Sequence, residues 1–242
     1  MPFEYFHSCL DLRPYIQSFW TLKGAGETYD TLYPDGCVDI IVNLGKRVVV
    51  TQKDIVLEER CVYLGGALTE SICEKIPEEV YLLGIRFSPG CFGHFYAPQF
   101  LGDIRDDCVQ VSEDFVPPWQ NLLQDPVSAL NLFFCEKLRA FHNPVRDAAA
   151  KIIQSGGNAS LSEIAIICSK SPRQTERVFK QYVGLTPKQF CKIVKYSCTQ
   201  ELLAARAPSE TLLAIALAAG YYDHAHLTKE YKKITRRTPS GK

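Results

Sequence analysis

The last 80 or so residues of this 242-residue chain contain the same pattern twice, at a nearly constant offset. Six residue pairs lie 52 positions apart, and pairs further upstream lie 51 apart, so one copy carries a single insertion. Each copy predicts a short apolar helix, a tight turn and a second helix whose outward positions are basic or hydrogen-bonding. This arrangement is typical of a helix-turn-helix, whose second helix enters a DNA major groove. The pairs are Ser171 and Asp223, Arg177 and Lys229, Phe179 and Tyr231, Lys180 and Lys232, Thr186 and Thr238, and Pro187 and Pro239.

The helix starts in this region are marked by hydroxyl caps. Ser160, Ser171 and Thr186 are each followed three residues later by Glu or Gln, as in a capping box. The fourth predicted helix, with roughly 19 residues, would span about 28 Å. That length suits a helix that holds two recognition helices near the ~34 Å repeat of B-DNA. The predicted helices are 144–155, 161–168, 172–183, 187–205, 210–219 and 224–235, with a further short one after Pro239.

Charge divides the chain into two unlike halves, although its formal net charge is zero. From Met1 to Asn143 there are 11 Lys and Arg against 20 Asp and Glu, a net charge of −9; from Pro144 to Lys242 the counts are 16 and 7, a net charge of +9. This asymmetry indicates one half that binds a polyanion and another with a different role. We therefore predict two domains: 1–143, a β-rich sensor or dimerisation domain, and 144–242, a DNA-binding domain.

The acidic half contains short runs rich in Val, Ile, Tyr and Phe, separated by turn residues. Their spacing predicts an antiparallel sheet or barrel. A later stretch from Pro126 to Phe141 has apolar residues at helical spacing. The expected fold is thus α+β with two domains: an N-terminal β-barrel or cupin-like sheet with flanking helices, and an all-α C-terminal domain with two helix-turn-helix units joined by a long helix. The β-type runs are YIQSFWTL, CVDIIVNL, RVVVT, CVYLGGAL and VYLLGIRF.

One charged residue, Arg86, lies inside the most apolar of these runs. A guanidinium that points inward needs an anionic partner, because a buried unpaired charge is costly. We expect Arg86 to anchor an anionic group of a small-molecule effector, with Trp20, Tyr33 and Asp39 as weaker candidates for the same site.

The stretch IALAAGYYDHAHLTKEYKKITRRTP resembles the signature of AraC/XylS-type transcription regulators, and SPRQTERVFKQYVGLTPKQF is similar to that family's first repeat. The resemblance covers about 100 residues from Pro144 onward, and it implies a sequence-specific DNA-binding regulator. YPDGCVDIIVNLG and LLGIRFSPG resemble, less specifically, β-rich domains of unassigned role found before such DNA-binding domains. The chain departs from the family pattern at Ser169, Thr175, Lys229 and Arg236, where Gly, Leu, Arg and Gly are usual.

Helix geometry assigns roles to the outward residues of the two predicted recognition helices. Arg173 or Arg177 can bind guanine O6 and N7, Glu176 can accept from a cytosine amino group, and Ala225 suits a thymine methyl. Lys180 lies nearer the phosphates. The ten predicted DNA-binding residues are Arg173, Gln174, Glu176, Arg177, Lys180, His224, Ala225, Thr228, Lys229 and Lys232.

An enzymatic function finds little support in the sequence. It has no nucleophile-elbow, phosphate-loop or dinucleotide-binding motif. His224, His226 and Glu230 imitate part of a cupin metal motif, but the glycine spacing is wrong and helix caps surround them. The Cys91 and His94 pair is more typical of packing than of metal ligation. We therefore expect no enzyme activity, no cofactor and no metal.

The regulation of the predicted DNA-binding protein stays open between three inputs. A small-molecule effector in the N-terminal half is one, and a partner protein is another. The third is redox or metal sensing through the ten dispersed cysteines. RNA polymerase and a second copy of the chain are further expected partners. No signal peptide and no membrane-length apolar run is present, so we expect a cytoplasmic protein.

Overall fold

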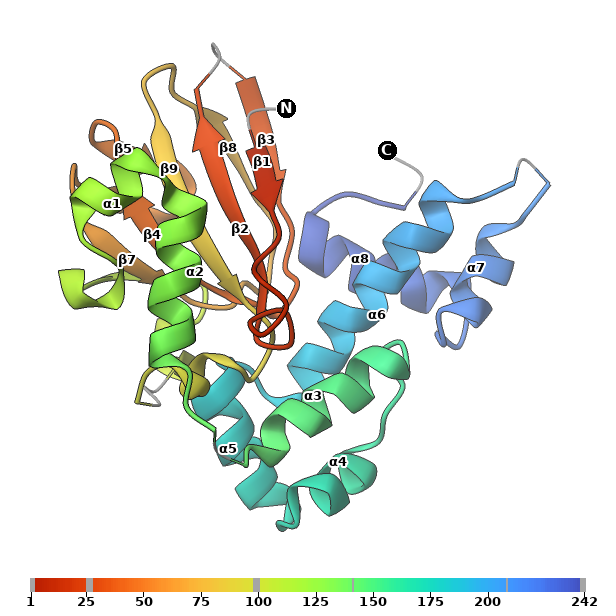
Figure 1. The fold of residues 1–242 in the computed structure, drawn as a ribbon. Coiled ribbons are helices and arrows are strands. Elements are labelled where there is room, and N and C mark those ends of the chain that lie inside the picture. Colours follow the sequence, from red (N-terminus) through yellow and green to blue (C-terminus); the bar gives the residue numbers. More distant parts are fainter. Residues whose placement is uncertain (1–2, 25–27, 98–100, 141, 208, 240–242) are drawn as a thin grey trace.

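The computed structural model describes residues 3–24, 28–97, 101–140, 142–207 and 209–239, which form a β-rich part and a helical part (Figure 1). The largest sheet has six antiparallel strands in the order β1-β2-β9-β4-β7-β10. Two smaller sheets pair β3 with β8 and β5 with β6. The strands are β1 Phe3–Phe6, β2 Ile16–Lys23, β3 Thr28–Leu32, β4 Val38–Asn43, β5 Val48–Val50, β6 Ile55–Leu57, β7 Val62–Gly65, β8 Ile72–Ile76, β9 Tyr81–Phe87 and β10 Cys108–Val111.

The two faces of the six-stranded sheet contact different parts of the protein. Because successive side chains of a strand point to opposite faces, adjacent residues of one strand have different surroundings. On β9, Leu83, Ile85 and Phe87 point to a face covered by α2, where Phe87 contacts Phe134 with ring centroids 5.7 Å apart. Arg86 points to the opposite face, toward the two small sheets. Three short 3₁₀ helices lie between strands: η1 Thr51–Lys53 between β5 and β6, and η2 Phe92–His94 and η3 Leu101–Ile104 between β9 and β10. After β10 come η4 Glu113–Phe115, α1 Trp119–Gln124 and α2 Pro126–Lys137.

Six helices form the C-terminal part within the described residues, and they follow the predicted ones to within two residues, α7 being two residues shorter at its start. In Figure 1 α6 runs from the group α3, α4 and α5 at one end to α7 and α8 at the other. The short helix predicted after Pro239 falls on residues that the structure does not describe. The helices are α3 Pro144–Gln154, α4 Leu161–Cys168, α5 Pro172–Val183, α6 Pro187–Ala204, α7 Leu212–Ala218 and α8 His224–Thr235.

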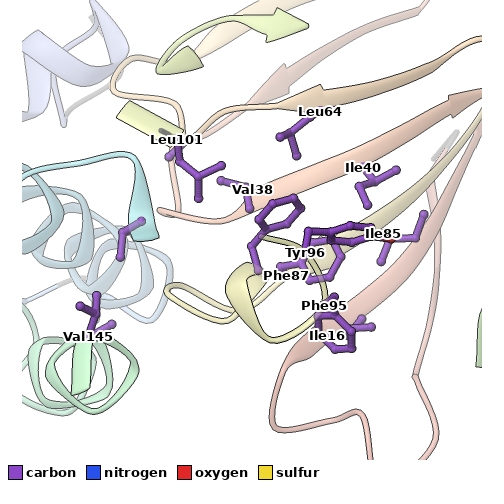
Figure 2. Close-up of a cluster of buried hydrophobic side chains, with 14 of the residues drawn as sticks. Ile16, Val38, Ile40, Leu64, Ile85, Phe87, Phe95, Tyr96, Leu101 and Val145 are labelled. Atoms are coloured by element: carbon purple, nitrogen blue, oxygen red, sulfur yellow. The ribbon is translucent and has the colours of Figure 1, made fainter. Parts of the chain in front are cut away.

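A single hydrophobic core crosses from the sheet into the helices (Figure 2). Phe87 of β9, Leu101 of η3 and Val145 of α3 all belong to it, and so does Phe190 of α6. The turn before β4 approaches α6 so closely that a Cβ on Gly36, whose φ is +79°, would lie within van der Waals radii of the Phe190 ring. The first helix-turn-helix unit therefore shares its packing with the β-rich part, whereas α7 and α8 pack in a separate cluster around Ile215 and Leu227.

Candidate nucleic-acid interface and ligand cavity

The first helix-turn-helix unit is α4 and α5, and each helix starts with a complete capping box. The Ser160 hydroxyl accepts from the Glu163 amide while the Glu163 carboxylate accepts from the Ser160 amide, and Ser171 and Gln174 repeat this arrangement. Between the helices, Ser169 adopts a left-handed conformation with φ of 51°. A residue at this point must have positive φ, which explains why the related family usually has Gly there.

The second unit, α7 and α8, has the same plan with different end residues. Asp223 caps α8, and its Oδ1 accepts from the His226 amide at 2.7 Å. Arg236 ends α8 with φ of 58°, again where the family usually has Gly. The Arg236 guanidinium binds the Glu70 carboxylate at 3.1 Å, so this Arg contributes a contact that Gly lacks.

The helix α6 joins the two units and is fixed to α8 by polar and aromatic contacts. Its 18 residues span about 27 Å. Tyr196 lies against Tyr231 with ring centroids 5.3 Å apart, and the Tyr231 hydroxyl donates to Gln200 Oε1 at 2.8 Å. Lys192 binds Glu230 at 2.7 Å. These contacts hold one side of α8 against α6.

The structure exposes nine of the ten predicted DNA-binding side chains and leaves Thr228 half-buried. Two of the ten are already engaged within their own helix. The Gln174 amide oxygen accepts from Ser171, and the Thr228 hydroxyl donates to the His224 carbonyl at 2.7 Å. The bonds to Ser171 occupy the Gln174 amide oxygen, so only the N–H₂ group of this side chain can contact a base. The exposed ones are Arg173, Gln174, Glu176, Arg177, Lys180, His224, Ala225, Lys229 and Lys232.

The acidic residue of the apparent cupin motif has an electrostatic role within the helices. Burial alone would raise the pKa of Glu230, but hydrogen bonds and charge from Lys192 and Lys233 lower it to about 2. Glu230 therefore remains ionised as the partner of two lysines. No group of three metal-ligating side chains is found in the described parts of the chain.

The β-rich part contacts both recognition helices. A Cβ on Gly102 of η3 would lie 3.4 Å from the Lys180 carbonyl oxygen of α5. At the other unit, the amide and the hydroxyl of Ser71 both donate to the Ile234 carbonyl at the end of α8, at 2.8 and 3.1 Å. Together with the ion pair between Glu70 and Arg236, these bonds form a latch on α8.

A cavity of about 450 Å³ lies between the six-stranded sheet and the two small sheets. Its volume is within the ~300–1,000 Å³ typical of small-molecule sites. Most of its lining is apolar, and Ser197 of α6 also lines it. The four predicted effector residues, Trp20, Tyr33, Asp39 and Arg86, are brought together in this lining.

The charged end of the cavity is a cluster of Asp35, Asp39 and Arg86. Arg86 Nε and Nη2 each lie 3.1 Å from an Asp39 oxygen, and Nη1 lies 3.1 Å from Asp35 Oδ2. Trp20 Nε1 also donates to Asp39 at 2.8 Å. The inward Arg86 thus has its anionic partners within the chain, which differs from the expected role as anchor for an anionic effector. The guanidinium is neutralised, and one carboxylate charge remains in excess.

The pKa shifts agree with a charged cluster. Burial raises the pKa of Asp39, and Arg86 opposes this rise. Burial lowers the pKa of Arg86, but Asp39 and then Asp35 outweigh it, so the net shift is upward. Both Asp39 oxygens accept from Arg86 or Trp20, as an ionised carboxylate does.

Sequence reasoning missed two residues of this site. In the sequence Asp35 indicates only a Pro-Asp-Gly turn; its position four residues before Asp39 is the signal for a second carboxylate near Arg86. Ser197 carries no signal, because it reaches the cavity only through the way α6 packs on the β-rich part.

All ten cysteines are free thiols, and two of them lie close together. The Sγ atoms of Cys9 and Cys135 are 3.5 Å apart. Burial and the neighbouring Cys9 raise the pKa of Cys135 to about 11, which keeps it protonated at neutral pH. In the pair with predicted packing roles, Cys91 Sγ faces the Pro14 carbonyl at 3.7 Å and His94 Nδ1 lies 3.1 Å from the Arg139 carbonyl.

Two known families match separate parts of the chain. Residues 4–110 match a family described as a domain of unknown function (DUF6597), and residues 164–241 match a family described as a helix-turn-helix domain. An uncharacterised HTH-type transcriptional regulator from Haemophilus influenzae is 30% identical over 80 residues, which are 33% of this chain and 26% of the relative. The chain thus spans about a quarter of that relative's length.

Solved structures of several regulators match this chain with low TM-scores. An AraC-type regulator from Chromobacterium violaceum is 26% identical, with 40% of this chain and 86% of that chain covered and a TM-score of 0.36. ToxT from Vibrio cholerae is 10% identical over 99% of this chain and 97% of its own, with a TM-score of 0.46. ToxT bound to an unsaturated fatty acid is 11% identical, with 92% of each chain covered and a TM-score of 0.42.

A membrane-crossing helix would need a long apolar run, and none of the helices within the described ranges has one. The helix-turn-helix match, the HTH-type relative and the repeated helical units agree that the C-terminal part contains a helix-turn-helix domain. Residues 164–241 are therefore similar to the helix-turn-helix domains of transcriptional regulators.

Proposed function

We propose that this chain is a sequence-specific DNA-binding transcription regulator controlled by a small molecule in its N-terminal cavity. In this proposal residues 1–143 sense the effector and residues 144–242 bind DNA. The observation that carries it is the pair of exposed, basic recognition helices, α5 and α8, held at the two ends of α6. Their side chains read bases, and the surrounding lysines and arginines contact phosphates.

A chain of contacts supports the coupling between cavity and DNA. Tyr33 lines the cavity and lies near Tyr196 of α6, with ring centroids 6.3 Å apart. Tyr196 in turn contacts Tyr231 of α8. Ser197, the next residue of α6, lines the cavity itself. A ligand that moves Tyr33 therefore changes what α6 and α8 pack against, and it shifts the populations of two arrangements if it binds one more tightly.

Selection of the purified protein against a random duplex library at moderate salt tests this function. We expect two short enriched sequence blocks about one helical turn apart, because two recognition helices on one side of a duplex meet successive major-groove segments. The double variant Arg177→Ala and Lys229→Ala is the matched control, since it removes one exposed cation from each recognition helix. Salt-sensitive binding without any enriched sequence would contradict specific readout.

The cavity favours a small-molecule input over control by a partner protein, because a partner protein that acts alone requires no cavity in the N-terminal part. RNA polymerase and a second copy of the chain remain proposed partners in transcription. Crosslinking with polymerase and light scattering of the free protein test these two contacts separately.

A redox input has one geometric basis, the Cys9 and Cys135 pair. These thiols can form a disulfide only after an added oxidant removes two electrons, and a bond of about 2.05 Å requires their sulfurs to approach further. The raised pKa of Cys135 slows this reaction. Cys135→Ser protein that loses an oxidant-dependent change in DNA affinity would support redox control, and an unchanged response would remove the pair from regulation.

A further inference from the structure

We propose that the cavity binds an amphipathic cation, an apolar molecule with one ammonium-like group, and that the cation lies against Asp35. This proposal rests on the proposed function in taking the cavity as the effector site. It differs from the sequence prediction, which expected an anionic group on Arg86. The reasons are the charge balance, the geometry of Arg86 and the apolar and aromatic lining.

The charge balance of the lining is negative. Five carboxylates and two cations line the cavity, and the only guanidinium among the described lining residues is bound by two of those carboxylates. An opposite charge within about 4–6 Å is stabilised by such an excess, and a like charge is destabilised. The carboxylates are Asp30, Asp35, Asp39, Asp106 and Asp107, and the cations are Lys75 and Arg86.

The geometry of Arg86 leaves little room for an anion. All three of its nitrogens already point to a carboxylate oxygen at 3.1 Å. An anionic ligand that approached Arg86 would lie beside the Asp35 and Asp39 carboxylates, whose negative charges would repel it. Asp35 is the less buried of the two, with 36% of its side chain exposed against 14% for Asp39, so its outer lone pairs are those that an incoming cation can reach.

The rest of the lining suits an apolar body and an aromatic contact with the cation. Trp20 is flattened against β9, where a Cβ on Gly84 would clash with its indole ring. Tyr33, two residues before Asp35, is 50% exposed and lines the same cavity, as does Tyr5 at 62%. Aromatic faces near a carboxylate stabilise an ammonium by cation–π attraction. The exposed aromatic rim also allows an apolar tail to extend beyond the cavity.

The test uses three probes with the same apolar tail and different head charge: decylammonium, decanol and decanoate, each below its aggregation threshold. Binding is followed by fluorescence in Trp119→Phe protein, because Trp20 then remains as the only tryptophan and lines the cavity. We expect decylammonium to bind most tightly, then decanol, then decanoate. A preference for the ammonium over the alcohol of about ten-fold is expected for a hydrogen bond to a charged group.

Asp35→Asn should reduce this preference to near one. The amide side chain that this substitution introduces keeps an oxygen that can accept the Cys37 amide bond now made by Asp35, so the turn remains supported. Glu79→Gln is the matched control, because it removes one surface carboxylate that pairs with Lys46 and does not line the cavity. It should leave the order of the probes unchanged.

Decanoate binding as tightly as decylammonium, or an ammonium preference that survives in Asp35→Asn, would overturn the proposal, and so would failure of all three probes to bind. These outcomes are independent of DNA. Failure of the library selection would instead contradict the regulator function and leave the head-charge order intact.

Discussion

Thr175→Val should stabilise the protein. Thr175 stands on the packed face of α5, is fully buried, and its hydroxyl has no hydrogen-bond partner among the described residues. A buried hydroxyl without a partner costs about 1–3 kcal/mol in protein mutational data. Val has the same shape and a similar helix propensity, so it removes this cost without opening a cavity. The related family usually has Leu here, which agrees with an apolar site.

The expected gain is about 1 kcal/mol, which corresponds to a rise in Tm of roughly 2–4 °C for a chain of this size. Urea and thermal unfolding measure it. Thr199→Val is the matched control, because Thr199 is equally buried on α6 but its hydroxyl donates to the Lys195 carbonyl at 2.7 Å. Losing that bond should destabilise by about 0.5–1.5 kcal/mol.

The two variants should therefore shift stability in opposite directions, while DNA affinity stays unchanged since Arg173 and Arg177 remain exposed. If Thr175→Val lowers the stability as much as Thr199→Val does, the Thr175 hydroxyl has a partner in solution. The reasoning from an unpartnered group would then be refuted.

Three further predictions concern DNA binding, the latch and pH. Arg177→Ala should reduce the preference for one base at one position of the DNA site by about 1–3 kcal/mol. Lys180→Ala should weaken binding to all DNA sequences alike and lower the slope of log affinity against log salt by about one. Binding titrations at several salt concentrations measure both effects. The double variant Glu70→Ala and Ser71→Ala removes the two side chains by which the β-rich part holds α8. The loss of about 1 kcal/mol of contacts should speed amide hydrogen exchange in α8 about five-fold and leave exchange in α5 unchanged. Equal changes in both helices would contradict the latch. The lowered pKa of Glu230 contributes stability above pH 4.5 that is lost as pH falls through about 2, so Glu230→Gln should be less stable than the parent at neutral pH and equal to it near pH 2 in acid unfolding curves.

The helical half was predictable from the sequence because its signals are local. A hydroxyl three residues before Glu or Gln fixes a helix start, and the structure has complete capping boxes at Ser160, Ser171 and Thr186. The repeat then indicated the order of the helices. Ser169 and Arg236, which depart from the family, have the left-handed conformation that the family's Gly would adopt. Their backbone positions were therefore fixed by the helix ends and not by residue type.

The β-rich half was less predictable because its strands depend on distant partners. The five predicted runs correspond to β2, β4, β5, β7 and β9, but the short strands β1, β3, β6, β8 and β10 were not identified. For example, β3 pairs with β8, and the paired residues Thr31 and Cys73 are about 40 residues apart in the sequence. No local sequence pattern encodes that pairing. The same holds for Arg86, whose partners Asp35 and Asp39 are about 50 residues away.

The contacts of the β-rich part differ between the two recognition helices, and this difference determines where a signal can act. Helix α5 belongs to the shared core through Phe179 and Val183, so moving it would break buried packing. Helix α8 packs in its own cluster and reaches the β-rich part through the latch and the Tyr33, Tyr196 and Tyr231 contacts. Surface ion pairs and single hydrogen bonds are each worth about 1 kcal/mol, far less than a buried core. An effector that breaks the latch would therefore release α8 from the β-rich part at low cost, whereas α5 would stay attached to it.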